Sequence, residues 1–258
     1  MAYTHGILTE DIKKLKEKFP DIPVFSIGKS VEGRELFALK AGIGRKKIFL
    51  NGAHHGMEWL TAKVLIAFAE ELAENPPTAT SFYIVPMVNP DGVEIAAAGS
   101  RWQANARGVD LNHNYDALWA LSKKAEQEHG IFEPGPTRFG GEYPESEPES
   151  RAVADFTRQN DFDAAIALHS QGEVIYYDFC GCVPDGTEEY LNKFEACSNY
   201  LRDIPMGIAS YGGYKDWFIK KFKKPAFTIE IGLGENPLTL DMFDDVYSGV
   251  LPVLRSLV

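Results

Sequence analysis

Short apolar runs of strand length alternate along this chain with longer segments that have helical spacing. Gly-containing turns separate several of the strand-like runs, as is typical of strand boundaries. We expect strands at residues 24–27, 36–39, 47–50, 82–88, 163–169, 174–178 and 226–231. Strands separated by helices predict a single-domain α/β/α sandwich with a mixed, mostly parallel twisted sheet. The length of 258 residues fits one such domain spanning residues 1–258.

The first expected helix follows Thr9, whose hydroxyl is a typical N-cap, and ends near Pro20. Residues 59–72 have the spacing of a buried helix. Ser146 and Glu149 have the spacing of a capping box, which predicts a helix to about residue 158.

A last helix is expected from about residue 240, kinked at Pro252. Residues 89–145 show little regular pattern, and the run Asn89-Pro90-Asp91-Gly92 predicts a turn. A loop of that length in a compact domain is usually functional.

Composition excludes several classes of function. A net charge of −11 and a pI near 5.1 argue against a nucleic-acid partner, which requires clustered Lys and Arg. No apolar run reaches the roughly 18 residues of a membrane span. The N-terminus shows no basic start followed by an apolar stretch, so we expect a cytoplasmic location with no membrane partner and no obligate protein partner.

Three cysteines do not form a disulfide framework. The Cys180-x-Cys182 pair could bind a metal, but with no second pair nearby two ordinary buried thiols are the favoured interpretation.

Histidine and glutamate side chains stand where strand-like runs end. His55 and Glu58 follow the run that ends at Leu50, and His169 ends another run about 110 residues later. The carboxyl ends of strands in α/β sheets are where sites are built. A catalytic zinc ion takes three protein ligands of this kind and leaves one position for water. His54 is a competing neighbour, but it lacks the His-x-x-Glu spacing.

Glu230 lies within an apolar strand-like run, Phe227-Thr228-Ile229-Glu230-Ile231. A buried carboxylate is costly unless it is paired or has a function. A metal hydrolase needs such a group near the metal to accept a proton from water.

Six motifs occur together in the order in which one known family carries them. They are Gly52-Ala53-His54-His55-Gly56-Met57-Glu58-Trp59, Asn89-Pro90-Asp91-Gly92, Gly108-Val109-Asp110-Leu111-Asn112-His113-Asn114, Ala167-Leu168-His169-Ser170-Gln171, Gly212-Gly213-x-Lys215-Asp216-Trp217 and Phe227-Thr228-Ile229-Glu230. This set resembles the zinc carboxypeptidases of the carboxypeptidase A type over about residues 20–240. The stretches from Trp102 to Asn112 and from Tyr211 to Trp217 resemble a bacterial branch that cleaves γ-D-glutamyl–diaminopimelate bonds.

The resemblance implies one zinc ion per chain, held by the metal ligands His55, Glu58 and His169. It also implies that Glu230 acts as a general base and then as a general acid. The reaction would be hydrolysis of a small peptide by a metal-activated water.

The chain departs from the family at three arginine positions, which are occupied by Met57, Gln103 and His113. Only Asn112 remains of the Asn-Arg pair that grips a substrate carboxylate in the family. Neither His nor Gln reproduces the bidentate geometry of a guanidinium. Arg101 and Arg107 are candidate replacements, with solvated loop charges as the alternative.

The predicted substrate-binding residues are Asn112, His113, Lys215 and Tyr211. Lys215 aligns with the base of the family's specificity pocket, where it would favour a substrate with a deep carboxylate; the alternative is an exposed lysine. The family's mobile tyrosine aligns with Ile208, so Tyr211 and Tyr214 are nearby candidates, with aromatic packing as the alternative.

The resulting hypothesis is a zinc peptidase acting on γ-D-glutamyl–diaminopimelate bonds of peptidoglycan-derived peptides, in recycling or sporulation. A metallocarboxypeptidase for ordinary or acidic C-termini is the second hypothesis. An N-acyl amino acid deacylase and a zinc-free binding module are the others. Replacing Glu230 with Gln separates an enzyme from a binding module, since only turnover depends on the base.

Overall fold

The computed structural model describes all 258 residues and contains one sheet. Its strands are β1 (Val24–Lys29), β2 (Glu35–Ala41), β3 (Lys46–Gly52), β4 (Thr80–Val85), β5 (Ala164–His169), β6 (Val174–Tyr176), β7 (Leu201–Asp203) and β8 (Ala226–Glu230). Their order across the sheet is β1-β2-β4-β3-β5-β8-β6-β7. The central strands β4, β3, β5 and β8 are parallel, whereas β2 and β6 pair with this central group in the antiparallel direction. The predicted mixed sheet is confirmed.

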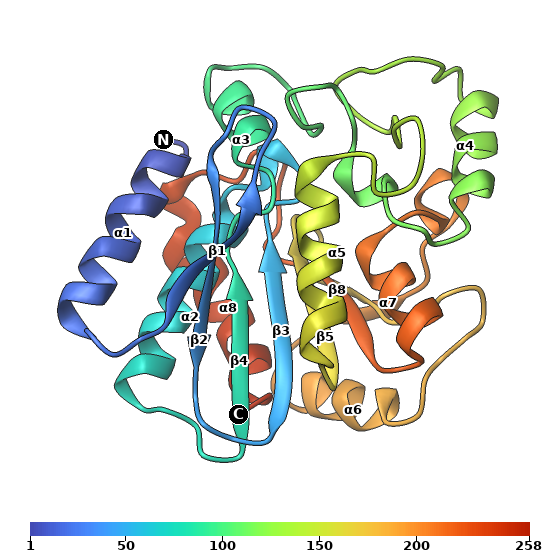
Figure 1. Cartoon of the computed structure of the whole chain (residues 1–258). Helices are drawn as coiled ribbons and strands as arrows, with labels where there is room; N and C mark the ends of the chain where they lie inside the picture. The colour runs from blue at the N-terminus through green and yellow to red at the C-terminus, as the bar shows by residue number, and fades with distance from the viewer.

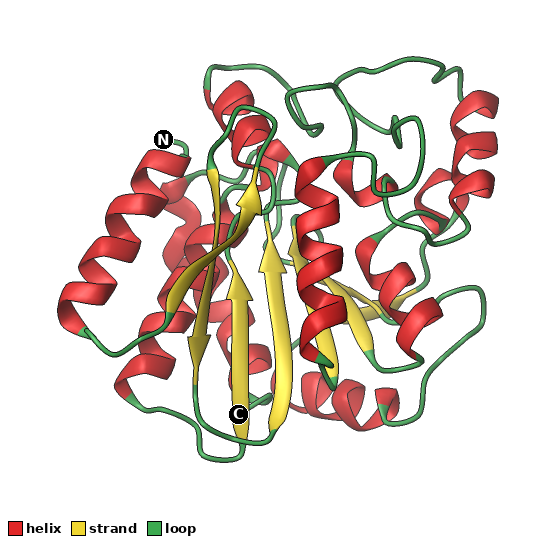
Figure 2. Ribbon diagram, in the orientation of Figure 1, coloured by secondary structure: helices red, strands yellow, loops and turns green.

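Helices cover both faces of the sheet (Figures 1 and 2). They are α1 (His5–Lys18), α2 (Leu60–Glu74), α3 (Pro90–Ala97), α4 (Trp119–Glu128), α5 (Pro148–Asn160), α6 (Thr187–Cys197), α7 (Tyr214–Phe222) and α8 (Phe243–Arg255). Helix α2 packs on the sheet between α1 and α8, and α6 packs against α8. Helices α5 and α7 cover the opposite face. The α/β/α sandwich is confirmed.

The central strands are apolar on both sides because each side faces a different core. In β5 every residue is buried. Ile166 and Leu168 join the larger core beneath α1, α2, α6 and α8, whereas Ala165 and Ala167 join the smaller core beneath α5 and α7. A strand buried on both faces loses the alternation of polar and apolar residues, which explains the continuous apolar run in the sequence.

Helix α1 begins earlier than predicted. Oγ1 of Thr4 accepts a hydrogen bond from the amide of Ile7, so Thr4 is the N-cap. Thr9 lies inside the helix, where its hydroxyl donates to the carbonyl of His5. The prediction of Thr9 as N-cap was therefore wrong. Thr4 and Thr9 both precede apolar residues with helical spacing, so the local pattern does not distinguish between them.

The predicted helix at 146–158 exists as α5, but the predicted capping box does not. Glu147 is the N-cap and makes no capping hydrogen bond with its side chain, and Pro148 begins the helix. The carboxylate of Glu149 instead accepts a hydrogen bond from the backbone amide of Val31, which is distant in the sequence. It is therefore not available for the predicted bond with the backbone at Ser146.

The segment 89–145 is more regular than predicted, since it contains α3, α4 and the short helix η2 (Leu111–His113). Asn89 was expected in a turn, but its Oδ1 accepts from the amide of Gly92 and it caps α3, with Pro90 in the first turn. The strand predicted to extend to Val88 ends at Val85. Helices α6 and α7 and the short strand β7 were not predicted.

Candidate active site

Three adjacent parallel strands end at the same edge of the sheet and bring the predicted site residues together. Strand β5 ends at His169 and β8 ends at Glu230, and these two residues are partners in the register of the sheet. Strand β3, on the other side of β5, ends at Gly52 and leads directly into the turn that carries His55 and Glu58. The carboxyl ends of parallel strands form the expected location of a site.

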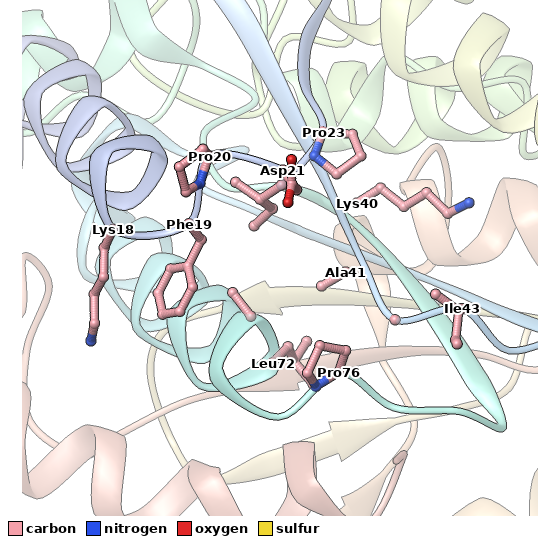
Figure 3. Close-up of a pocket in the computed structure, with 13 residues that line it drawn as sticks. Lys18, Phe19, Pro20, Asp21, Pro23, Lys40, Ala41, Ile43, Leu72 and Pro76 are labelled. Carbon is pink, nitrogen blue, oxygen red and sulfur yellow. The ribbon is translucent and has the colours of Figure 1, made fainter.

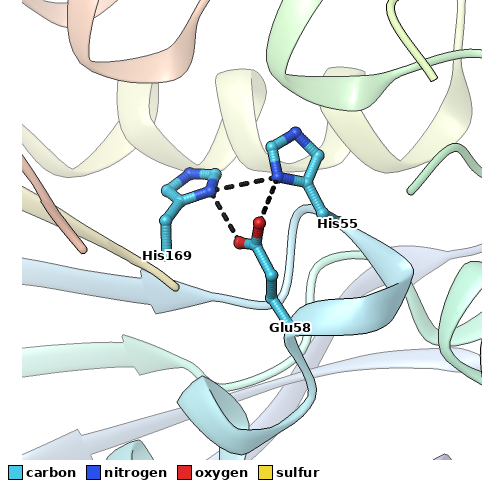
Figure 4. A group of neighbouring side chains, drawn as sticks. All are labelled: His55, Glu58 and His169. Carbon is cyan, nitrogen blue, oxygen red and sulfur yellow. Dashed lines mark hydrogen bonds and ion pairs between the residues drawn. The ribbon is translucent and has the colours of Figure 1, made fainter. Parts of the chain in front are cut away.

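The side chains of His55, Glu58 and His169 converge on one point (Figure 4). Their ligand atoms all lie within 4.8 Å of one another. Nδ1 of His55 is 2.8 Å from one carboxylate oxygen of Glu58, and Nδ1 of His169 is 2.9 Å from the other. Two imidazole nitrogens and a carboxylate are a donor set that zinc accepts, with a fourth position left for water. The residues therefore fit a catalytic zinc ion.

The turn that carries His55 and Glu58 is fixed by close backbone packing. Gly56 begins the short helix η1 (Gly56–Glu58), and a Cβ at this position would lie 2.3 Å from the carbonyl oxygen of Gly92. The side-chain nitrogen Nδ2 of Asn89 donates to the carbonyls of His54, Gln103 and Ala104. Only a glycine permits this approach of η1 to α3, which explains the glycine between the two candidate ligands.

A buried carboxylate lies on the far side of the His55 ring. Nε2 of His55 is 3.2 Å from Oδ1 of Asp110. Although burial opposes the effect, the carboxylates of Glu58 and Asp110 raise the pKa of His55 well above its usual value. Burial likewise opposes ionisation of Glu58, but His55 and His169 lower the pKa of its carboxyl to about 2. Although burial opposes the shift, the pKa of the Asp110 carboxyl is also lowered, mainly by His55. The carboxylates of Glu58 and Asp110 therefore stay ionised, so the site attracts a cation.

Glu230 lies beside this group in an environment that favours its protonated form. Burial and the neighbouring Glu58 carboxylate raise the pKa of Glu230 above its ordinary value. No hydrogen bond within the chain occupies its carboxylate, and it lines the same cleft as His55, Glu58 and His169. A carboxyl group that can both accept and release a proton near neutral pH is suited to general acid–base catalysis.

The site opens into a polar cleft of about 870 Å³. The cleft has charged groups of both signs on its walls. The cationic side chains are Arg101, Arg138 and Lys215, and the acidic ones outside the metal group are Asp203, Asp216, Glu230 and Glu235. A ligand with both positive and negative groups is therefore complementary to this cleft.

Asn112 and Lys215, two of the four predicted substrate-binding residues, lie in the cleft. Lys215 is not an exposed lysine: its side chain is 4% exposed, and its Nζ lies 2.5 Å from Oδ1 of Asp216. Its charge is therefore already paired inside the chain. Asn112 accepts a hydrogen bond through Oδ1 from the amide of Tyr214.

Neither His113 nor Tyr211, the other two candidates, lines the cleft. His113 is buried, with Nδ1 near Ser122 and Nε2 near Arg138, so it does not face a ligand directly. Tyr211 packs against the smaller core, and Tyr214 is fully buried with its hydroxyl near Thr157. Aromatic packing is thus what the structure shows for both tyrosines.

The sequence interpretation missed Arg138. Of the arginines considered as replacements, Arg101 lines the cleft, whereas Arg107 pairs with Glu147 at 3.5 Å outside it. Arg138 lies in the segment between α4 and α5, outside every motif. Only the packing of this segment in the folded chain places its side chain at the cleft. Its isolated position between a threonine and a phenylalanine gave no signal in the sequence.

Other parts of the molecule lack comparable chemistry. Cys180 is exposed and Cys182 partly buried, which corrects the prediction of two buried thiols, and neither belongs to a metal-binding group. A second pocket of about 560 Å³ lies near the amino ends of the parallel strands, between the end of α1 and the end of α2 (Figure 3). Its walls are largely apolar and include Phe19, Ile43 and Leu72. No helix of the structure is long and apolar enough to cross a membrane.

Comparison with known proteins agrees with this geometry. The sequence model described as zinc carboxypeptidase matches residues 8–245. The chain belongs to this family. Its members are zinc enzymes, so the chain is a zinc-dependent metallopeptidase and a hydrolase.

Individual relatives support the assignment. The chain is 34% identical to the gamma-D-glutamyl-L-diamino acid endopeptidase 1 of Lysinibacillus sphaericus, over 97% of this chain and 71% of the relative. It is 26% identical to bovine carboxypeptidase A1, over 80% of this chain and 56% of the relative. The solved structure of bovine thrombin-activatable fibrinolysis inhibitor, in complex with tick carboxypeptidase inhibitor, has the same fold. Its TM-score is 0.81 at 22% identity, covering 100% of this chain and 96% of the other.

Proposed function

We propose that this zinc peptidase hydrolyses γ-D-glutamyl–diaminopimelate bonds in peptides derived from peptidoglycan. The observation that carries the catalytic part is the convergence of His55, Glu58 and His169 beside Glu230 at the base of a polar cleft. We assign the three converging residues as ligands of one zinc ion and Glu230 as the catalytic base.

The roles of the protein groups follow from their positions. A zinc ion in this position lowers the pKa of water and polarises a carbonyl oxygen. Glu230 takes one proton from the attacking water as the C–O bond forms, and gives that proton to the leaving nitrogen as the C–N bond breaks. Asp110 keeps the His55 ring in one orientation by accepting a hydrogen bond from Nε2, which directs Nδ1 toward the metal position.

Two observations support a diamino acid as the leaving residue. The relative that is 34% identical over nearly the whole chain carries the name of an endopeptidase for such bonds. In addition, Lys215 and Asp216 offer one positive and one negative group side by side in the cleft. The far end of diaminopimelate carries an amino group and a carboxylate on one carbon, so its charges complement this pair.

The test measures metal content by elemental analysis and hydrolysis of L-Ala-γ-D-Glu-meso-diaminopimelate before and after chelation. The expected result is one zinc per chain and release of L-Ala-γ-D-Glu that stops on chelation and resumes with zinc. Zinc without cleavage of this tripeptide would refute the substrate.

A contribution of Lys215 is tested with Lys215→Met and two substrates that differ in one carboxylate. Diaminopimelate carries this carboxylate and L-lysine lacks it. The KM for the diaminopimelate peptide should rise, while the KM for the lysine peptide should change little. An equal effect on both peptides would argue against recognition of that carboxylate.

The second candidate is a metallocarboxypeptidase acting on ordinary or acidic C-terminal residues, which the similarity to carboxypeptidase A1 favours. Peptides ending in Glu or Lys distinguish the two functions in the same assay. The presence of the three candidate ligands together with Glu230 argues against a non-catalytic binding module.

A further inference from the structure

Arg138 carries a positive charge that no carboxylate of the chain pairs with. Its guanidinium makes one hydrogen bond within the chain, between Nη1 and Nε2 of His113 at 3.2 Å. Its backbone has a positive φ of 69°, which disfavours residues with a side chain, and its amide donates to Oδ2 of Asp110. A guanidinium has five donors in a planar fork, so most of those of Arg138 are free for a ligand in the cleft.

A chain of buried groups holds the Arg138 side chain in place. Oγ of Ser122 donates to a carboxylate oxygen of Glu126, so it accepts from Nδ1 of His113, 3.2 Å away. Nε2 of His113 then has a lone pair and accepts from Arg138. Burial lowers the pKa of His113 to about 4, although Asp110 opposes the shift, so the ring is neutral at physiological pH. His113 therefore acts as an acceptor for Arg138.

His113, the partner of Arg138, lies beside the segment that leads into Lys215 and Asp216. The backbone of His113 contacts Gly212, and Oδ1 of the adjacent Asn112 accepts from the amide of Tyr214, the residue before Lys215. Nδ2 of Asn112 has no partner in the chain, and its side chain lines the cleft with Arg138. One guanidinium and one amide with free donors thus lie in the cleft, both tied to the segment that leads into Lys215 and Asp216.

We propose that Arg138 binds the carboxylate next to the scissile nitrogen of the leaving residue, with His113 as its positioning residue. The inference rests on the proposed function in that the leaving residue occupies the end of the cleft near Lys215. A guanidinium fork matches a carboxylate through two parallel hydrogen bonds. Positions 57, 103 and 113, where the family has arginines, carry no arginine in this chain. Arg138, in the segment between α4 and α5, thereby provides a cation for the cleft.

The experiment compares two peptides that differ only at this carboxylate, one with the free acid and one with the amide. In Arg138→Ala the KM for the acid should rise about 10- to 100-fold, the loss expected for a charge-assisted hydrogen bond. The KM for the amide should change less than about threefold. Methylguanidinium in solution should restore part of the activity on the acid only. An acid-to-amide preference that is the same in Arg138→Ala and wild type would overturn the proposal.

Further variants separate recognition from structural damage. Arg138→Lys keeps the charge without the fork and should retain part of the preference for the acid. Arg107→Ala, an arginine outside the cleft, is the matched control and should behave like the wild type. If Arg101→Ala removed the preference and Arg138→Ala did not, the assignment would be wrong. Zinc content and thermal unfolding should be the same in all the variants.

The role of His113 is tested in the same way. His113→Leu removes the acceptor and should raise the KM for the acid with kcat nearly unchanged. His113→Gln places an oxygen near Nε2 and should recover part of the loss. Equal kcat and KM defects on both peptides in His113→Leu would contradict a positioning role.

The failure of this inference is distinct from failure of the proposed function. If the wild type does not cleave the γ-D-glutamyl peptide, the substrate proposal fails by itself. The acid and amide pair is then made from the peptide that the enzyme does cleave, and the comparison of Arg138→Ala with wild type still decides the role of Arg138.

Discussion

Nε2 of His55 lies 3.2 Å from Oδ1 of Asp110, while Nδ1 of the same ring faces Glu58 and His169. Burial opposes ionisation of Asp110, but His55 and His113 hold the pKa of its carboxyl well below its usual range. The ionised carboxylate therefore accepts a hydrogen bond from Nε2, so that Nδ1 is the ring nitrogen that faces the candidate metal position. The other oxygen of Asp110 accepts from the amide of Arg138 at 2.9 Å, so one side chain supports both a candidate metal ligand and the proposed anion-binding residue.

Replacing Asp110 with Asn should weaken zinc binding by about 10- to 100-fold, because the His55 ring loses its ionised acceptor. Both oxygens of Asp110 accept hydrogen bonds, and Asn offers only one oxygen, which is neutral. Competition with a chelating indicator dye measures this affinity. Asp116→Asn is the control, since Asp116 is exposed in the same region and pairs only with Lys220. Unchanged zinc affinity in Asp110→Asn would show that the ring is held by other contacts.

Glu230→Gln should lower kcat by about 10²- to 10⁴-fold while zinc content stays at the wild-type value. The amide cannot accept the water proton, whereas the metal ligands are untouched. Steady-state kinetics and elemental analysis on the same preparation give both quantities. Glu10→Gln, on the exposed face of α1, is the control for loss of one carboxylate. Turnover close to that of the wild type would exclude Glu230 as the base.

Removal of the metal should lower the melting temperature. The carboxylates of Glu58 and Asp110 are buried at one site, and a bound cation stabilises the folded state only. Zinc at about 1,000 times its Kd adds about 4 kcal/mol to the free energy of unfolding. Calorimetry with and without a chelator measures the difference, and His169→Ala should show little response to zinc. A wild type whose melting is indifferent to chelation would contradict the assigned ligands.

A pair of identical glycine substitutions should have opposite effects. Gly56→Ala forces a Cβ to within 2.3 Å of a carbonyl oxygen, so it should destabilise the fold and lower zinc affinity together. Gly6→Ala in α1 meets nothing nearer than 3.8 Å and should stabilise by about 0.5–1 kcal/mol through helix propensity. Urea unfolding measures both variants. Wild-type zinc affinity in Gly56→Ala would show that the turn can shift freely.

Glu149 should make stability depend on pH. Burial raises the pKa of its carboxyl from 4.5 to about 7 in the folded state. A raised folded pKa means that this contribution is fully present below pH 4.5 and is lost as the pH rises through 7. At 1.36 kcal/mol per pH unit the difference is about 3 kcal/mol.

Urea unfolding of wild type and Glu149→Gln at pH 5 and pH 8 tests this dependence. The variant lacks the titrating group, so its loss of stability relative to wild type should be larger at pH 5 than at pH 8. Parallel losses at both values would mean that Glu149 does not titrate in this range.

Several features were visible in the sequence because they depend on local order. Apolar runs identified the central strands, since β3, β5 and β8 are buried on both faces. The same runs placed His169 at the end of one strand and Glu230 within another. Neighbouring parallel strands meet at one edge, so the candidate metal group could be named before its geometry was known. The predictions of a capping box at Ser146 and of an N-cap at Thr9 were wrong, because several nearby polar side chains can cap the same helix.

The sequence by itself determined the central strands, the edge of the sheet that carries the candidate site and the candidate zinc ligands, because these follow from hydrophobic periodicity and from motifs near strand ends. Only the tertiary structure decided that Lys215 is paired with Asp216, that His113 turns away from the cleft and that Arg138 enters it. His113 and Arg138 are 25 positions apart, and the Lys215 side chain is held in the cleft by the carbonyl of Asp178, 37 positions away. The packing of segments distant in sequence sets these side-chain positions, and no local sequence pattern encodes that packing.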